Sequence, residues 1–160
     1  MRSYQVFASM SPERAVEMMR VLAEKVPAVF AQAIAAASFA MKARPVYLQR
    51  QPFEKQAEAA RRALSRVTSN PVAGEVLAVY FLECRKELLV EWLDALGLEH
   101  EEGTLEADAP APPPQPELRK ALESFLAVDD DPDRRLLLAA FAAQDAIDWP
   151  DLEALLAADS

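Results

Sequence analysis

A polar capping residue beside a proline recurs along this chain of 160 residues, and it constrains the fold more than any other feature. The capping side chain accepts a hydrogen bond from a backbone N–H that the first helical turn leaves unpaired. Proline at the first helical position has no N–H to satisfy and already holds the helical φ. With only three glycines in the sequence, the pattern predicts an all-α fold. The helix starts of this kind are Ser11-Pro12, Asn70-Pro71, Asp131-Pro132 and Asp148-Trp149-Pro150.

Apolar residues at helical spacing divide the chain into six to eight helices. The helix over 71–96 is the longest, and we expect it at the centre of one compact bundle because residues 76–82 are apolar on every side. Two further helices, over 27–43 and 132–144, are apolar nearly all round, which is typical of buried helices. The predicted helices cover residues 12–25, 27–43, 52–67, 71–96, 116–127, 132–144 and 149–157.

The length fits one helical domain over residues 1–160. We expect an N-terminal helical part (1–98), an acidic and proline-rich spacer (99–115) and C-terminal helices (116–160). Residues 1–100 carry 13 Lys or Arg and 11 Asp or Glu, whereas residues 101–160 carry 4 and 15. This segregation of charge favours docking of the C-terminal helices on the first part.

Composition narrows the classes of protein that this chain can represent. A single cysteine, Cys84, excludes an internal disulfide and fits a reducing compartment. The N-terminus has no sustained apolar run, so we expect no signal peptide. The most apolar stretch, residues 26–41, is shorter than the roughly 20 residues of a membrane-spanning helix. We therefore expect a cytoplasmic protein without a membrane segment, and the Ala, Leu, Arg and Asp usage is typical of bacterial proteins.

Motifs for catalysis and for metal or cofactor binding are missing from the sequence. The acids at 129–133 alternate as in a calcium loop, but the required glycine and glutamate are replaced by Arg134 and Ala140, which favours helix capping. His100, the only histidine, lies in a charged turn, and no His-Glu-x-x-His pattern accompanies it. Cys84 falls on an apolar helix stripe, where a small core residue is expected. We predict no catalytic residue, metal ligand or cofactor.

A basic segment over residues 42–66 stands out in an otherwise acidic chain. It has seven cationic residues and only two glutamates, Glu54 and Glu58, so its local net charge is +5. Such a surface suits an acidic protein, a phosphate group or a single-stranded nucleic acid. The interpretation that we prefer for this segment is structural: Glu58 pairs with Arg62 one turn away, and the other cations face the acidic C-terminal part. The candidate partner-binding residues are Lys42, Arg44, Arg50, Lys55, Arg61, Arg62 and Arg66.

Three functional hypotheses follow from these observations. We favour a non-enzymatic adaptor or regulatory protein that contacts a partner through an exposed basic or apolar face. The second is an enzyme or small-molecule carrier with a pocket between helices, near Trp92, Tyr80 or Tyr47. The third and weaker one is single-stranded nucleic-acid binding through residues 42–66, because phosphate neutralisation is disfavoured in a chain of net charge −9. A homodimer also stays open, since a second copy would cover the most apolar helices.

Overall fold

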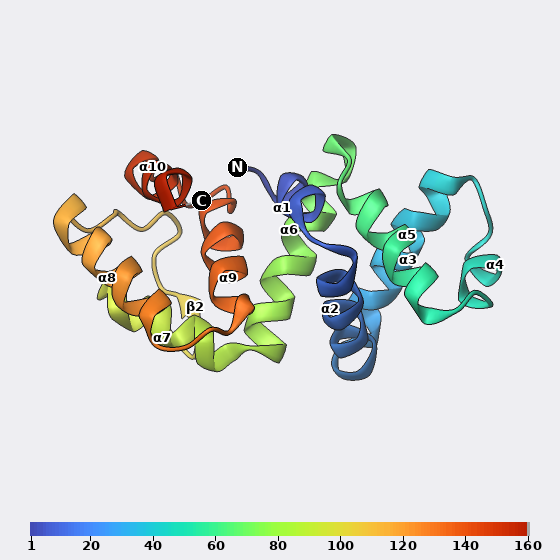
Figure 1. Cartoon of the computed structure of the whole chain (residues 1–160), viewed down its shortest axis with the longest axis horizontal. Helices are drawn as coiled ribbons and strands as arrows, with labels where there is room; N and C mark the ends of the chain where they lie inside the picture. The colour runs from blue at the N-terminus through green and yellow to red at the C-terminus, as the bar shows by residue number, and fades with distance from the viewer. Residues whose placement is uncertain (160) are drawn as a thin grey trace. The chain divides into compact units, whose positions relative to one another are not determined.

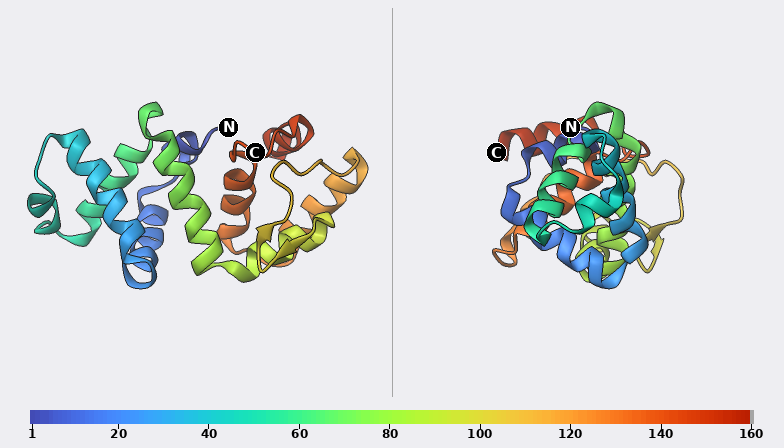
Figure 2. Two further views of the ribbon diagram at one scale, coloured as in Figure 1. Left: turned by 180° about the vertical axis from the view of Figure 1, so that it is seen from behind. Right: turned by 90° about the vertical axis from the view of Figure 1, so that its right-hand side faces the viewer.

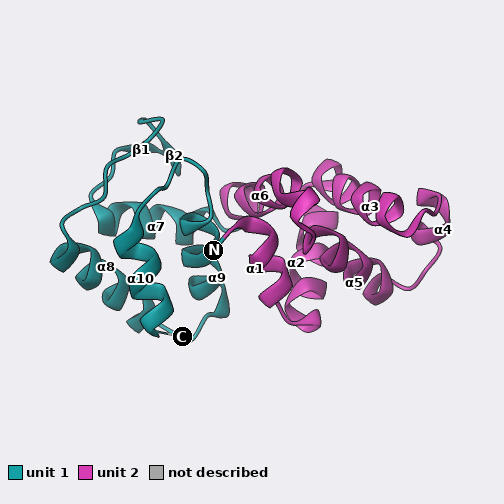
Figure 3. Cartoon of the chain, turned by 90° about the horizontal axis from the view of Figure 1, so that it is seen from above, with its two compact units in different colours: residues 1, 85–160 teal, residues 2–84 magenta. Residues whose placement is uncertain are grey.

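The computed structural model describes residues 1–159, and these form two compact units (Figure 3). The N-terminal unit comprises residues 2–84. The C-terminal unit comprises Met1 and the chain from Arg85 onward. Ten α-helices and one small hairpin make up the described chain, which confirms the predicted all-α class. None of these helices is both long enough and apolar enough to cross a membrane.

The N-terminal unit is built from six α-helices. The predicted helix cap is present at the start of α2, where Ser11 Oγ accepts a 3.2 Å hydrogen bond from the Arg14 N–H. Asn70 differs, because its side chain accepts a 3.1 Å bond from the Tyr4 N–H and so links α6 to α1. The elements are α1 (Ser3–Ser9), α2 (Pro12–Lys25), α3 (Pro27–Met41), α4 (Pro45–Gln49), α5 (Phe53–Leu64), a 3-10 turn (Val67–Ser69), α6 (Asn70–Val79) and a π-helical turn (Tyr80–Cys84).

Helix α3 packs against α2, α4, α5 and α6, and α5 packs against α1 and α2 (Figures 1 and 2). Met18, Met19, Leu22 and Leu64 fill the interior between these helices. Alanines form much of the contact between α3 and α5, with Ala37 and Ala63 in one buried cluster. Small side chains let the two helix axes approach closely, and this close approach shapes the surface described below.

The predicted central helix over 71–96 is wrong as one continuous element. Helix α6 widens into the π-helical turn, and Arg85 then leaves the helical conformation with φ −134° and ψ 44° before α7 begins at Lys86. The guanidinium of Arg85 binds Asp131 at 2.8 Å and Asp133 at 2.6 Å. These contacts with the start of a distant helix favour the break, and no proline or glycine marks it locally.

The C-terminal unit packs its helices around Trp92, which lies 5.4 Å from the ring of Phe125 and 5.9 Å from that of Phe141. Gly97 ends α7 at φ 71°, in a left-handed cap. The proline-rich segment is held by a 2.9 Å hydrogen bond from the indole of Trp149 to the Pro110 carbonyl. The elements are α7 (Lys86–Leu96), β1 (His100–Glu101), β2 (Thr104–Leu105), α8 (Gln115–Ala127), α9 (Pro132–Ala142) and α10 (Pro150–Asp159).

The number of helices exceeds the expected six to eight for two reasons. The short helices α1 and α4 have too few residues to show a helical period, and the predicted long helix is divided at Arg85. The division also assigns residues 86–98 to the same unit as the proline-rich segment. Docking of the acidic C-terminal helices on the first part stays a prediction.

Candidate interaction surface

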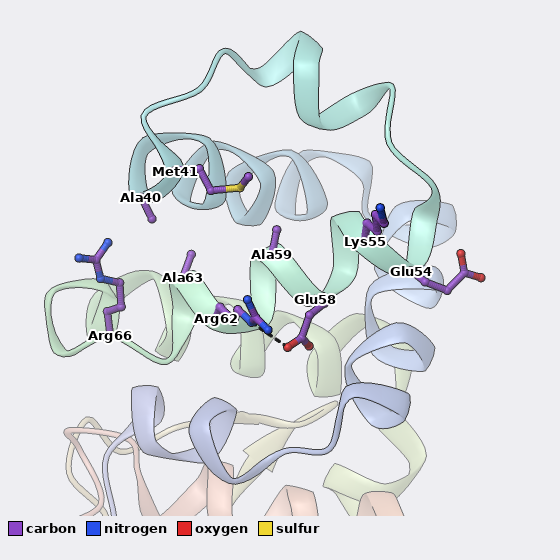
Figure 4. A pocket seen from close by; sticks show the side chains of 9 residues that line it. All are labelled: Ala40, Met41, Glu54, Lys55, Glu58, Ala59, Arg62, Ala63 and Arg66. Carbon is purple, nitrogen blue, oxygen red and sulfur yellow. Dashed lines mark hydrogen bonds and ion pairs between the residues drawn. The ribbon is translucent and has the colours of Figure 1, made fainter.

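An open groove of about 690 Å³ lies between α3 and α5 in the N-terminal unit (Figure 4). Its floor is formed by Ala59 and Ala63, which point from α5 toward Ala40 and Met41 at the end of α3. Helix α5 is amphipathic: its alanines turn inward, while its long charged side chains stand at the edge. We call this hollow the basic groove, because three cations line it.

Lys55, Arg62 and Arg66 are those cations. Lys55 and Arg62 are seven residues apart on α5, which places them on one side of the helix. Arg66 follows the end of α5 and has an extended backbone, with φ −90° and ψ 142°. Arg62 donates to Glu58 at 3.1 Å. Within residues 2–84, no carboxylate lies within ion-pair distance of Lys55 or Arg66, and both side chains are exposed. Two of the three cations are thus available to an incoming anion.

Arg61 has a different role from the one expected of it. Its guanidinium makes two hydrogen bonds to Glu58, at 2.7 and 2.8 Å, and a longer one of 3.4 Å to the Phe7 carbonyl. These bonds from Arg61 lower the pKa of the Glu58 carboxyl, and they raise the pKa of Arg61. Arg61 is only partly exposed and serves to tie α5 to α1.

The other three predicted cations lie on α4 and its flanks. Lys42 ends α3 in the left-handed conformation at φ 55°, and Arg44 and Arg50 flank α4 at its two ends. All three are exposed, and none lines the basic groove. The structure therefore divides the seven predicted residues into three at the groove, three around α4 and one in a local ion pair.

Large apolar side chains are exposed on the same elements. Among the described residues seven large apolar side chains are exposed, and five of them lie between residues 39 and 67. Phe39 is 87% exposed, and it stands two residues before Met41, which lines the groove. Val46 and Tyr47 on α4 are about half exposed. Large apolar groups exposed in one short stretch of the chain indicate a surface that contacts another molecule.

This exposure corrects the expectation that the helix over 27–43 is largely buried. Helix α3 packs its inward side on its neighbours, but the side that carries Ala31, Ala35 and Phe39 faces solvent. The reason is that too few helices surround α3 to cover every side of this apolar helix. The missed signal was in the sequence, since Phe39 precedes two cations, Lys42 and Arg44, within five residues.

The aromatic residues proposed to line an interhelical pocket are placed differently. Trp92 is fully buried against other rings, and its indole N–H has no hydrogen-bond acceptor among the described residues. Tyr80 is buried beside Phe81, and Tyr47 is exposed on α4. Phe53, at the start of α5, stacks on Phe30 at 5.7 Å. These rings do not converge on one site.

The residues considered for metal or nucleophilic chemistry have structural partners. His100 Nε2 lies 2.7 Å from Asp94, and its Nδ1 accepts a bond from the Gly103 N–H. Cys84 is buried, and burial raises the pKa of its thiol, which disfavours the reactive thiolate. Among residues 1–159, no three His, Cys, Asp or Glu side chains are grouped to hold a metal ion.

A second hollow, of about 550 Å³, lies between α9 and α10 in the C-terminal unit. Its charged groups are already paired: the Met1 ammonium binds Glu153 at 2.9 Å, and Arg135 binds Asp159. The basic groove differs because it keeps cations without a carboxylate partner in their own unit. It is therefore the stronger candidate for binding.

Comparisons of the chain with models of protein families, with curated proteins and with solved structures found no match. The candidate function therefore comes from the site alone.

Proposed function

We propose that this chain is a protein-interaction module, an adaptor or a regulatory subunit, whose N-terminal unit binds an acidic protein partner. The observation that carries the proposal is the coincidence of unpaired cations and exposed apolar side chains on α3, α4 and α5. Apolar area supplies affinity at such a surface, and charge supplies specificity and a faster encounter.

Protein is favoured over nucleic acid by the chemistry of the same surface. A single-stranded nucleic acid needs a cationic track with exposed aromatic rings on which bases stack. Exposed rings are present at Phe39 and Tyr47, but Glu54 and Glu58 line the basic groove beside its cations. Carboxylates in the site repel phosphates, whereas a folded partner can place its own charges between them.

Native mass spectrometry on the gently purified chain tests this function. We expect the wild-type chain to retain a second protein, and we expect R62E/R66E to lose it. The matched control is R119E/K120E, which makes the same charge change at two exposed residues of α8. Equal retention by all three chains would exclude the basic groove, and a bound small molecule or an RNA would favour the alternative hypotheses. Circular dichroism checks that each variant keeps its helices.

A further inference from the structure

We propose that the hairpin of β1 and β2 is a pH-responsive element, held closed by neutral His100 and released when that imidazole takes up a proton. The hairpin lies beside α7 in the C-terminal unit (Figure 3). The inference does not depend on the basic groove or on the proposed function. It is carried by the two hydrogen bonds of the ring, by the burial of the groups that make them and by the small size of the hairpin.

The hairpin contains a tight turn in which two consecutive residues have positive φ. The strands pair in a register that leaves Glu102 and Gly103 as a two-residue loop. The φ angles of these residues are 50° and 94°. Positive φ at both positions is typical of a type I′ turn, in which asparagine or aspartate is favoured before the glycine. Glutamate adopts positive φ less readily, so a contact from outside the backbone is needed to hold this turn.

The His100 ring supplies that contact. The N–H of Gly103, a buried residue, donates to Nδ1 at 3.1 Å. A ring nitrogen that accepts a hydrogen bond carries no proton, so the imidazole is neutral and its proton is on Nε2. Nε2–H therefore donates to Asp94 Oδ1, which lies 2.7 Å away. Only 10% of the His100 side chain is exposed, so little water can reach either bond.

Protonation conflicts with one of these two bonds and not with the other. An imidazolium carries an N–H at each ring nitrogen. At Nε2 the bond to Asp94 persists and becomes a charge-assisted one. At Nδ1 the new N–H would point at the Gly103 N–H, and the buried amide would be left without an acceptor. Protonation therefore releases the turn, while Asp94 keeps the ring beside α7.

The charged groups around the ring come from α7 and from the hairpin itself. Helix α7 contributes Asp94 at Nε2 and also Lys86, whose ammonium lies 3.7 Å from the carboxylate of Glu102. The residue paired with His100 across the hairpin is Leu105, so β2 places no charge opposite the ring. The remaining charged residues of this segment are the glutamates at positions 99, 101 and 106. Carboxylates therefore outnumber cations here, and the conflict that a proton creates is confined to Nδ1.

The hairpin is too small to stay closed without its turn. Each strand has two residues, and beyond them the Glu106 N–H donates to the Glu99 carbonyl at 3.2 Å. Hairpins of two strands are marginally stable on their own. Leu98 and Leu105 are partly buried, and both line a hollow of about 420 Å³ beside the hairpin. Release of the turn would let β2 separate from β1 and would open this hollow further.

Amide hydrogen exchange measured by NMR on the intact chain tests this inference. The protection factor of the Gly103 amide, which is corrected for the intrinsic effect of pH on exchange, is followed between about pH 7.5 and about pH 5.5. The carbon-bound Hε1 proton of His100 reports protonation of the ring in the same samples. Glutamates ordinarily titrate below this range. We expect Gly103 to be protected at the upper pH and to lose protection about tenfold or more, with the same midpoint as the imidazole.

Two substitutions of His100 separate the roles of its nitrogens. H100N places an amide oxygen where Nδ1 lies and does not titrate in this range, so Gly103 should keep its protection at both pH values. H100Q extends its amide toward Asp94 and gives Gly103 no acceptor, so the protection should be low at both. Circular dichroism checks that each variant keeps its helices. D94N is a third variant: it removes the carboxylate that attracts the imidazolium, so release of Gly103 should require a lower pH.

Four results would overturn the proposal. Gly103 could stay protected while His100 titrates, or it could lack protection in the wild-type chain at the upper pH. The ring could stay neutral down to about pH 5.5. Finally, H100N could lose protection as much as the wild-type chain does, which would assign the pH dependence to other groups. None of these results bears on the basic groove, which is tested by retention of a partner in the wild-type chain and in R62E/R66E.

Discussion

Replacement of Arg134 by methionine should destabilise the C-terminal unit far more than the same replacement at its neighbour Arg135. The Arg134 side chain is almost fully buried, and its guanidinium donates to Glu91 at 2.7 Å and to the Phe125 carbonyl at 3.1 Å. It also binds Asp129 and lies 4.7 Å from the centre of the Phe125 ring. Arg135 is 64% exposed and makes one ion pair.

The expected loss in the free energy of unfolding follows from the interactions that Glu91 and the Phe125 carbonyl lose. Removal of one partner of a buried ion pair costs about 3–5 kcal/mol. The Glu91 side chain is 39% exposed, so water replaces part of that interaction and the charge contribution falls to about 1 kcal/mol. The buried Phe125 carbonyl loses a donor, which costs about 1 kcal/mol more. Loss of the cation above the ring brings the total to about 2–3 kcal/mol. For R135M we expect the free energy of unfolding to fall by less than about 0.5 kcal/mol.

Urea unfolding followed by tryptophan fluorescence measures this difference in the correct unit. Both tryptophans of the chain, Trp92 and Trp149, belong to the C-terminal unit. With a slope of about 2 kcal/mol per molar urea, R134M should lower the unfolding midpoint by about 1 M or more. R134K should recover little of the lost stability, because the ammonium of lysine lacks the planar fork of donors that a guanidinium has. Equal shifts for R134M and R135M, or a loss below 0.5 kcal/mol for R134M, would refute the reasoning.

Two further predictions concern single residues of the two units. G97A should lower the free energy of unfolding by about 1–2 kcal/mol in the same urea assay, because Gly97 has φ 71°. No neighbouring atom lies within 4 Å of the added Cβ, so the cost comes from the backbone alone. A neutral effect would contradict this prediction. Since Arg61 holds the folded pKa of Glu58 below its unfolded value, this pair stabilises the fold above about pH 4, and that stabilisation is lost as the pH falls through the folded pKa. Acid unfolding of E58Q followed by circular dichroism should therefore show a weaker pH dependence than wild type, and an unchanged dependence would count against the ion pair.

Helix boundaries were predictable where the chain itself supplies the start and the stop. The predicted range 12–25 coincides with α2, because Ser11 and Pro12 define its start locally and Pro27 prevents its continuation into α3. The break at Arg85 was not predictable, because residues 71–96 contain no local breaker other than Gly74 near the start. The acids that hold Arg85 lie more than forty residues away in the sequence.

The candidate site was predictable in its charges and not in its shape. Helical spacing predicted Lys55, Arg62 and Arg66 on one side of a helix over 52–67, and all three line the basic groove although α5 ends at Leu64. The ion pair of Arg61 with Glu58 follows from their spacing of three residues on one helix, but the sequence analysis paired Glu58 only with Arg62. The longer bond from Arg61 to the Phe7 carbonyl involves α1, a helix that the sequence pattern does not reveal. The exposure of Phe39 depends on how many helices surround α3, which is a property of the tertiary structure.

The alanine contact between α3 and α5 determines how freely this sequence can change over time. Ala37 and Ala63 are almost completely enclosed, so a larger side chain at either position forces the helices apart at a cost of about 1–3 kcal/mol. Glycine at either position costs about 1 kcal/mol in helix propensity. The exposed cations of α5 carry neither penalty. Folding therefore preserves the shape of the basic groove, whereas its charges are free to vary without loss of the fold.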